Sequence, residues 1–352
     1  MKIKYVILAI FTFFSATFVF ADNDKAEAYT LSGAEAVMER DSLRVLHGYN
    51  MDEKMPMAST TKILTAITVI ENYDLSKEIT VPKETVGVEG SSVYLKAGDR
   101  YTVNDLLYGL MLRSGNDCAE TLAVTLSGSK ENFVAKMNEF AAYCGAENSN
   151  FTNPHGLPDE NHYTTARDLC KIACKAMQNS KFKEIVSSKS YTATELNSGT
   201  KTLWVNKNKL LRSYDGATGI KTGFTVKAGR CLVSSAERNG MEVVCVVLNS
   251  PQMFERSTEL LDAAYNNYKL IKVVDSEKFD YTVFSEDKTS LVNLRIKEDF
   301  YYPVKEGENV SAEIDIPKNI TLPVNDDEEI GSIKIYCEKR LIFSEKIYTL
   351  II

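Results

Sequence analysis

The spacing of apolar residues along the chain predicts strands first, then helices, then strands again. Residues 34–38 and 44–49 are rich in apolar and β-favouring side chains on either side of a polar break, which predicts a two-stranded hairpin. Residues 58–70 carry a single charge, at Lys62, so we expect a helix that is buried on nearly every side. A lysine in such a helix needs an explanation, because burial disfavours its charged form.

Helical patterns dominate from about residue 75 to 180 and recur at 103–113, 117–126, 130–143 and 165–177. Strand patterns return at 219–225, 230–236 and 242–248, and a helical pattern follows at 254–270. This order predicts an α+β domain with a central antiparallel sheet and an inserted helical lobe. Beyond residue 278, short alternating strands at 310–316, 330–336 and 341–348 predict a small all-β C-terminal domain.

The N-terminus has the layout of a secretory signal. Lys2 and Lys4 precede an apolar run over residues 5–20, and small side chains at Val19 and Ala21 suit an export peptidase. The run is shorter than the roughly 20 residues of a membrane span, so we expect cleavage after Ala21, with an uncleaved anchor as the alternative. We therefore expect an exported protein, either secreted or at the extracytoplasmic face of the envelope, with a signal peptide at 1–21, a larger domain at 22–271 and a β-rich domain at 272–352.

Net charge, cysteines and histidines limit the partners and cofactors that we expect. The formal net charge is −7 and no long basic stretch occurs, which excludes nucleic acid as an expected partner. The seven cysteines lack CxxC spacing, and an odd number in an exported chain leaves at least one thiol unpaired. We expect most of them to be small buried hydrophobes. The three histidines lack the spacing of a metal site, so neither a metal nor another cofactor is expected.

The first candidate for chemistry is the pair Ser59 and Lys62. Three residues apart on a helix, they share one face. Burial and a neighbouring cation both favour a neutral Lys62 amine, which can accept the Ser59 proton while Ser59 attacks a carbonyl. The Ser59 backbone N–H at the start of the helix faces the developing oxyanion. The alternative is a capping serine beside a lysine that reaches solvent.

Two further clusters complement this pair. Ser114-Gly115-Asn116 lies between two helical patterns, where it can present a hydroxyl and an amide to a cleft. Lys221-Thr222-Gly223 lies on a predicted strand, and Gly223 would let a substrate backbone lie close. Separately, these clusters are also typical of an ordinary loop and an exposed edge-strand lysine. In this order, the three clusters supply a nucleophile, a base, a proton relay and a cationic clamp.

The triple resembles that of penicillin-binding proteins and serine β-lactamases. The surrounding residues are similar to the low-molecular-mass D-alanyl-D-alanine carboxypeptidases, and the likeness covers nearly all of the chain after the signal. It is carried by Ala58-Ser59-Thr60-Thr61-Lys62, Arg113-Ser114-Gly115-Asn116-Asp117, Asn153-Pro154-His155-Gly156-Leu157, Thr165-Ala166-Arg167-Asp168 and Gly219-Ile220-Lys221-Thr222-Gly223-Phe224-Thr225. The resemblance makes residues 22–271 the catalytic domain.

The resemblance also implies roles for individual residues. Ser59 would be the acylated nucleophile, Lys62 its base and Ser114 the relay to the leaving amine. Asn116 would hold Lys62 and the substrate amide. The implied substrate-binding set is Lys221, Thr222, Gly223, Phe224, Thr225 and Arg256, with Lys221, Thr222 and Thr225 on the terminal carboxylate, Arg256 as a further carboxylate candidate, and the Phe224 N–H as the second oxyanion donor.

We accordingly expect a serine-type D-Ala-D-Ala carboxypeptidase that trims peptidoglycan stem pentapeptides and takes β-lactams as covalent ligands, with a role in cell-wall maturation and cross-link control. A β-lactamase is the nearest competitor, but it needs a carboxylate that activates water. Ala193 occupies the position of that carboxylate near Leu196-Asn197, and Glu195 is out of register. The other alternative is a non-catalytic wall-binding module. Peripheral membrane association stays open, because the C-terminal residues 346–352 are too few to lie stably on a bilayer alone.

Overall fold

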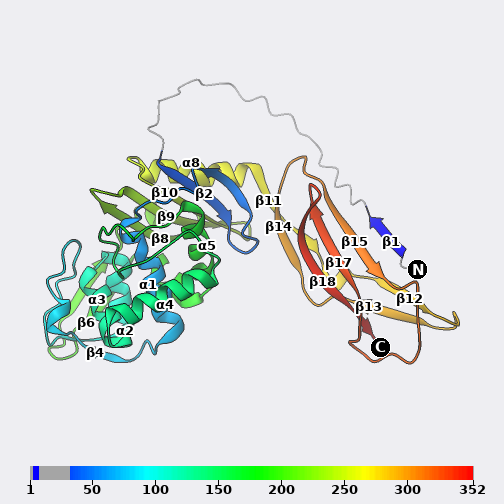
Figure 1. Cartoon of the computed structure of the whole chain (residues 1–352), viewed down its shortest axis with the longest axis horizontal. Coiled ribbons are helices and arrows are strands. Elements are labelled where there is room, and N and C mark those ends of the chain that lie inside the picture. The colour runs from blue at the N-terminus through cyan, green and yellow to red at the C-terminus, as the bar shows by residue number, and fades with distance from the viewer. Residues whose placement is uncertain (1–2, 8–31, 352) are drawn as a thin grey trace, which may run out of the picture. The chain divides into compact units, whose positions relative to one another are not determined.

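The structure is a computed structural model that describes residues 3–7 and 32–351. The described residues divide into two compact units, 32–266 and 267–351, and the second unit also takes in Ile3–Ile7 (Figure 1). Each unit has its own hydrophobic core.

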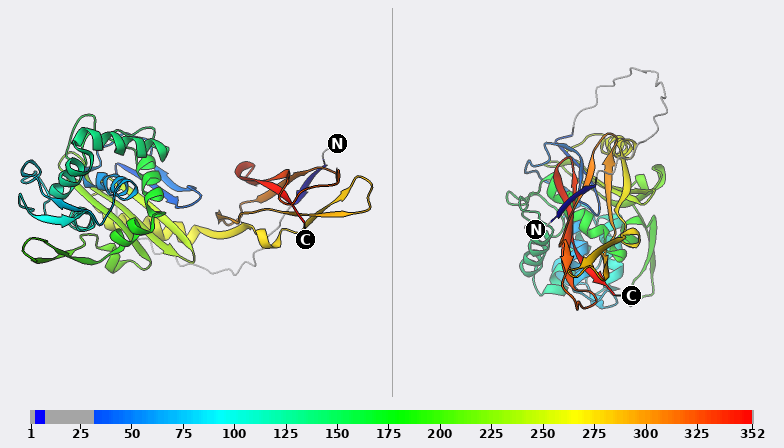
Figure 2. Two further views of the ribbon diagram at one scale, coloured as in Figure 1. Left: turned by 90° about the horizontal axis from the view of Figure 1, so that it is seen from below. Right: turned by 90° about the vertical axis from the view of Figure 1, so that its right-hand side faces the viewer.

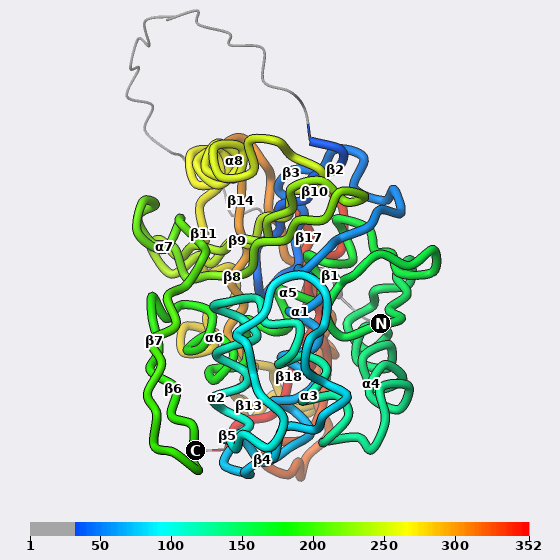
Figure 3. Tube along the Cα trace, turned by 90° about the vertical axis from the view of Figure 1, so that its left-hand side faces the viewer, coloured from blue at the N-terminus to red at the C-terminus, as the bar shows by residue number. Residues whose placement is uncertain are grey.

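The larger unit is built on a five-stranded antiparallel sheet of order β3-β2-β10-β9-β8. Its strands, in sheet order, are β3 (Val45–Tyr49), β2 (Ala34–Glu39), β10 (Met241–Leu248), β9 (Gly229–Arg238) and β8 (Ala217–Thr225). Every residue of β2 and β10 is buried, because α8 (Met253–Asn267) covers one face and α5 (Ala166–Met177) packs on the other (Figure 3). The predicted hairpin at the N-terminal edge is confirmed.

Helix α1 (Lys62–Asn72) runs through the core of this unit, and its first eight residues are all buried. The helix predicted over residues 58–70 is interrupted at its start: Ala58–Thr61 form a 3-10 turn, η1, before α1 begins. The backbone of Ala58 has φ +50°, outside the range of a right-handed helix. The turn therefore sets Ser59 apart from the regular helix.

The remaining helices of the larger unit form the helical lobe or lie at the edges of the sheet. They are α2 (Val103–Tyr108), α3 (Asn116–Ser127), α4 (Lys130–Tyr143), α6 (Ser180–Ser187) and α7 (Leu210–Ser213), with the short 3-10 turn η2 (Lys83–Thr85). Two small hairpins complete the unit, β4 (Glu78–Thr80) with β5 (Arg100–Thr102) and β6 (Ser190–Thr194) with β7 (Lys201–Val205).

Three details depart from the sequence prediction. Residues 144–165 contain no helix, and the only helical element within residues 75–102 is the 3-10 turn η2, which lies between β4 and β5. The helix predicted over 103–113 changes after α2 into a π-helical turn, η3 (Gly109–Arg113), and Ser114 follows in a left-handed conformation with φ +66°. Such π turns recur at functional sites, where they redirect the chain.

The smaller unit consists mainly of strands, which are coloured from yellow to red in Figure 2 except for the blue β1. A seven-stranded sheet has the order β1-β15-β17-β18-β13-β12-β16, and β11 pairs with β14. The strands are β1 (Ile3–Ile7), β11 (Tyr268–Val274), β12 (Tyr281–Ser285), β13 (Leu291–Arg295), β14 (Phe300–Lys305), β15 (Val310–Ile316), β16 (Asn319–Ile320), β17 (Glu329–Cys337) and β18 (Arg340–Leu350), with the 3-10 turn η4 (Ser276–Lys278). The three strands predicted here correspond to β15, β17 and β18.

The predicted fold class is confirmed: an α+β unit with a central antiparallel sheet and a helical lobe, followed by a small all-β unit. The predicted signal peptide, residues 1–21, lies outside the described residues except for the backbone of Ile3–Ile7, which pairs with β15. Six of the seven cysteines are buried and Cys144 is partly exposed, as expected of small apolar side chains. Among the described residues no helix is long and apolar enough to cross a membrane.

Candidate active site

The structure brings Ser59 and Lys62 into contact. Ser59 is partly exposed in η1, whereas Lys62, in the first turn of α1, has no exposed surface. Lys62 Nζ lies 3.0 Å from Ser59 Oγ. No side chain caps η1 or α1 through a hydrogen bond, and the lysine does not reach solvent. The alternative of a capping serine with a solvent-seeking lysine therefore does not describe this pair.

The other contacts of the Lys62 amine define its chemistry. Nζ lies 2.6 Å from Asn116 Oδ1 and 2.6 Å from the backbone oxygen of His155. Both oxygens are acceptors only. A neutral amine has two N–H bonds, which these two acceptors satisfy, and its lone pair is then left for the Ser59 hydroxyl. The geometry is that of a base poised to take the serine proton.

Burial and charge both favour the neutral amine. Burial lowers the pKa of Lys62 well below its usual value, and the nearby Lys221 cation lowers that pKa further. Lys221 itself is 2% exposed on β8, and burial followed by the charge of Lys207 lowers its pKa to about 7. Lys221 is therefore not an exposed edge-strand lysine. A neutral Lys62 next to a cationic Lys221 is the arrangement that the proposed chemistry needs.

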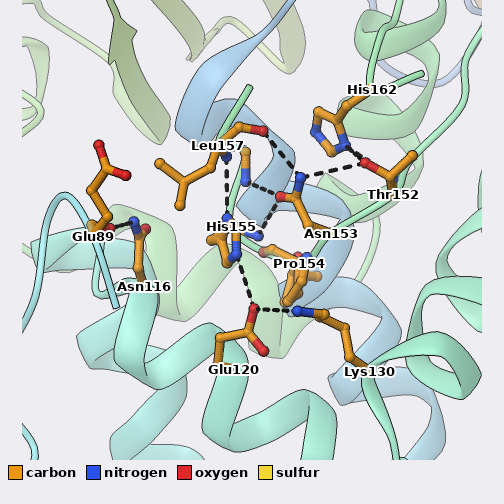
Figure 4. Close-up of polar contacts among 12 residues, drawn as sticks. Glu89, Asn116, Glu120, Lys130, Thr152, Asn153, Pro154, His155, Leu157 and His162 are labelled. Atoms are coloured by element: carbon orange, nitrogen blue, oxygen red, sulfur yellow. Dashed lines mark hydrogen bonds and ion pairs between the residues drawn. The ribbon is translucent and has the colours of Figure 1, made fainter. Parts of the chain in front are cut away.

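The second cluster enters the site from the end of η3. Asn116 begins α3, and besides holding Lys62 its Nδ2 donates to the backbone oxygen of Glu89 (Figure 4). Ser114 is buried in its left-handed conformation, two residues before Asn116, and its backbone N–H donates to Gly109. The described contacts of the Ser114 side chain include no hydrogen bond to Ser59 or Lys62, so its relay role rests on its position in the motif.

Gly223 fits closely against the turn that carries Ser59. A Cβ on Gly223 would lie 3.1 Å from the backbone nitrogens of Ser59 and Thr60 and 3.1 Å from the Met57 oxygen. The structure shows that Gly223 admits the turn that carries Ser59; its predicted role of letting a substrate backbone lie close stays a prediction. This packing also places the Ser59 N–H beside β8, one residue from Phe224, so the two candidate oxyanion donors belong to adjoining segments.

The remaining predicted residues are more scattered. Phe224 is 64% exposed, and Thr225 Oγ1 accepts a hydrogen bond from the Ala228 N–H. Thr222 lies between Lys221 and Gly223 on β8, and its backbone oxygen accepts from Lys221 Nζ at 2.9 Å.

Arg256, at the start of α8, is held by two carboxylates. Its guanidinium makes ion pairs with the buried Glu35 and with Glu259 on α8. Its contact with a substrate carboxylate stays a prediction. The ion pair with Glu35 accounts for the arginine structurally, because a buried carboxylate requires a partner.

Glu195, the carboxylate nearest to the β-lactamase position in the sequence, holds backbone N–H groups. Glu195 accepts hydrogen bonds from the backbone N–H groups of Arg100, Asn197 and Ser198. Burial raises the pKa of the Cys118 thiol well above its usual value, so this thiol is not a competing nucleophile. In the part of the chain that the structure describes, no group of three His, Cys, Asp or Glu side chains could hold a metal ion.

The segment Asn153-Pro154-His155-Gly156-Leu157 carries part of the family resemblance but had no predicted role. The structure places it against Lys62. A Cβ on Gly156, which has φ +91°, would lie 1.9 Å from the Ala58 oxygen. The contribution of His155 is a backbone carbonyl, which any residue type carries. The only sequence signal was the clustering of Pro154 and Gly156, which marks an irregular turn.

A serine and a buried amine at the start of a core helix, with an asparagine from the helical lobe and a lysine from the sheet edge, define the class of serine hydrolases that contains penicillin-binding proteins and serine β-lactamases. Within this class the chain belongs to the D-alanyl-D-alanine carboxypeptidase family, whose profile matches residues 21–252. Residues 265–350 match the profile described as penicillin-binding protein 5, C-terminal domain. The predicted family and the predicted enzyme class, a serine peptidase, are thereby confirmed.

Individual relatives cover most of the chain. D-alanyl-D-alanine carboxypeptidase DacF of Bacillus subtilis is 31% identical over 341 residues, which are 93% of this chain and 87% of the relative. The crystal structure of penicillin binding protein 5 from Haemophilus influenzae superposes with a TM-score of 0.77 at 27% identity, covering 91% of this chain and 96% of that one. The Streptomyces K15 DD-transpeptidase superposes with a TM-score of 0.61 at 35% identity, covering 66% of this chain and 95% of that one.

Proposed function

We propose that this protein removes the terminal D-alanine from peptidoglycan stem pentapeptides through an acyl-enzyme on Ser59, and that β-lactams acylate the same oxygen. The observation that carries the proposal is the contact set of Lys62 Nζ, in which two pure acceptors hold the amine and leave its lone pair for Ser59. The names of the relatives supply the substrate class.

The proposed reaction has two halves. Lys62 takes the Ser59 proton as Oγ forms a bond to the carbonyl carbon of the penultimate D-alanine, and the Ser59 and Phe224 N–H groups face the oxyanion. The C–N bond then breaks, and the leaving amine receives the proton from Lys62 through Ser114. In the second half, water adds to the acyl carbon with Lys62 again as base, and Ser59 Oγ leaves with a proton.

Lys221, Thr222 and Thr225 are the proposed carboxylate site. Lys221 provides the charge, and the two threonines lie along the same strand. A cationic group here would bind the terminal carboxylate of a peptide and the carboxylate of a penicillin through the same charge-assisted hydrogen bonds. This shared recognition explains why one site would take both.

We also propose that the protein acts outside the cytoplasmic membrane, after an export signal at residues 1–21 is removed, with residues 22–271 as its catalytic domain and 272–352 as its β-rich domain. N-terminal sequencing of the secreted protein tests the cleavage site, for which Asp22 is the expected first residue. Fractionation tests peripheral membrane association: release from membranes by high salt or carbonate supports it, and recovery only in the soluble fraction contradicts it.

The test of activity combines a fluorescent penicillin with a defined pentapeptide. We expect wild-type protein to become covalently labelled and to release one alanine per pentapeptide by mass spectrometry, and Ser59→Ala to do neither. A wall-binding module without catalysis would never label. Formation of peptide dimers would instead favour a transpeptidase, the activity named for the Streptomyces K15 structure.

A further inference from the structure

The backbone oxygen of His155 is one of the two acceptors that hold Lys62, yet it lies in an irregular segment. Its distance of 2.6 Å to Nζ equals that of Asn116 Oδ1. The orientation of this oxygen therefore matters as much as that of the asparagine. Because no helix or strand fixes the segment, its position depends on side chains.

Asn153 fixes the segment from within. Its Oδ1 accepts from the N–H groups of His155 and Gly156, and its Nδ2 donates to the Leu157 oxygen (Figure 4). Helix α1 adds one contact, because Thr65 Oγ1 donates to the Pro154 oxygen at 2.6 Å. These bonds close the turn and attach it to α1. The His155 imidazole attaches it to α3.

The His155 ring has a fixed pattern of donor and acceptor. Nδ1 accepts from the Leu157 N–H at 3.1 Å, so the ring hydrogen of the neutral imidazole is on Nε2. Nε2 lies 2.9 Å from Glu120 Oε1 and donates to it. Figure 4 shows the Glu120 side chain reaching from α3 toward this ring.

Glu120 lies four residues after Asn116 on α3, so both project from the same face of the helix. Asn116 holds the Lys62 amine directly, and Glu120 holds it through His155. A single helix face thus positions both oxygens that accept from the amine.

We propose that Glu120 and His155 are positioning residues for the base, with the Glu120 carboxylate holding the His155 ring so that the His155 carbonyl orients the Lys62 amine toward Ser59. This inference rests on the proposed function of Ser59 and Lys62. Neither side chain touches the reacting atoms, so their contribution is to the geometry of the base.

The charges around the pair agree with this arrangement. The groups facing His155 are Glu120 and Lys130 from the helices, Lys62 from the core and His162 from the same loop region. Burial lowers the pKa of His155, while Glu120 opposes that change. Burial is the largest single influence on Glu120 and raises its pKa, but the hydrogen bonds and charges of His155 and Lys130 together outweigh burial and leave that pKa lowered. The pair is therefore a carboxylate and a neutral imidazole over the neutral pH range.

The test compares two conservative changes. Glu120→Asp keeps the charge but shortens the side chain by one methylene, whereas Glu120→Gln loses the charge but keeps an acceptor oxygen within reach. Glu131→Asp, on an exposed residue in the first turn of α4, is the matched control. Stopped-flow acylation of the full-length protein by a fluorescent penicillin separates the dissociation constant of the first complex from the acylation rate constant.

We expect Glu120→Asp to lower the acylation rate constant by roughly 10- to 100-fold with little change in the dissociation constant, since a misplaced base costs rate rather than binding. Glu120→Gln should lose at least about fivefold less, because its amide oxygen accepts from Nε2. The control should match the wild type.

Three results would overturn the inference. They are an Asp variant that acylates like the control, a Gln variant that is as slow as Asp, and a loss that lies in the dissociation constant. If Glu120→Asp does not fold, His155→Gln provides the same comparison of rate constant with dissociation constant. A wild-type protein that never labels would instead refute the proposed function, which keeps the two failures distinct.

Discussion

Replacing Gly156 by alanine tests how closely the 153–157 segment is fitted to the nucleophile turn. The added Cβ would lie 1.9 Å from the Ala58 oxygen, 2.4 Å from the Ala58 carbonyl carbon and 2.9 Å from Thr61 Oγ1. Two of these atoms are backbone and cannot rotate away. Because non-bonded heavy atoms pack at about 3.5 Å or more, the Ala58 carbonyl has to retreat by more than about 1 Å.

The expected magnitudes follow from that displacement. The positive φ of +91° alone costs about 1–2 kcal/mol of stability for a residue with a Cβ. The collision adds about 1–3 kcal/mol, the usual cost of overpacking. Ala58 precedes Ser59, so the nucleophile moves relative to Lys62, and a shift of about 1 Å lowers the acylation rate roughly 100-fold.

Gly98→Ala is the matched control. Gly98 has nearly the same conformation, φ +89°, but its added Cβ would meet nothing within 4 Å. The control therefore shares the backbone strain and lacks the collision. Thermal unfolding measures stability, and the rate of labelling by a fluorescent penicillin measures the chemistry. A Gly156→Ala protein that labels as fast as Gly98→Ala would refute the proposed fit.

Three further predictions concern charged residues. Lys221 binds a carboxylate only as a cation and its pKa is lowered to about 7, so kcat/KM should fall as pH rises through about 7, and Lys221→Arg should remove this fall. Lys221→Met removes a cation beside Lys62 and so raises the pKa of Lys62; the rise of the acylation rate with pH, which follows deprotonation of Lys62, should therefore move to higher pH. Glu195→Gln should leave the release of bound penicillin unchanged while lowering the melting temperature, since its carboxylate holds three backbone N–H groups; a slower release would give it a role in hydrolysis. Arg256→Met should lower the free energy of unfolding in urea by about 1–3 kcal/mol, because the buried Glu35 contacts Arg256 and His47 and then keeps only His47 of these two partners. Labelling per folded molecule should stay unchanged; a loss of labelling with unchanged stability would make Arg256 a carboxylate ligand.

The sequence was most informative where chemistry and periodicity coincide. The spacing of Ser59 and Lys62 placed both on one face, and the apolar residues around Lys62 predicted its burial, which the structure bears out. The hairpin β2–β3 and the strands β8, β9 and β10 follow from local patterns of the kind that set strand formation.

Long-range contacts were not predictable in the same way. Arg256 and Glu35 are 221 residues apart, and no local pattern links a basic residue on a helix to a buried carboxylate on a strand. The His155 carbonyl carries no signature at all, because its residue type does not determine a backbone acceptor. The 3-10 turn at Ala58–Thr61 depends on packing by Gly156 and Gly223, which lie far along the chain.

The Lys62 amine is held by residues 54 and 93 positions further along the chain. A partly folded chain retains each short motif but not their meeting point, because tertiary packing alone brings them together. Covalent uptake of a penicillin should thus count native copies in a mixed population. The enzyme would carry its own folding reporter, suited to following its folding without an added tag.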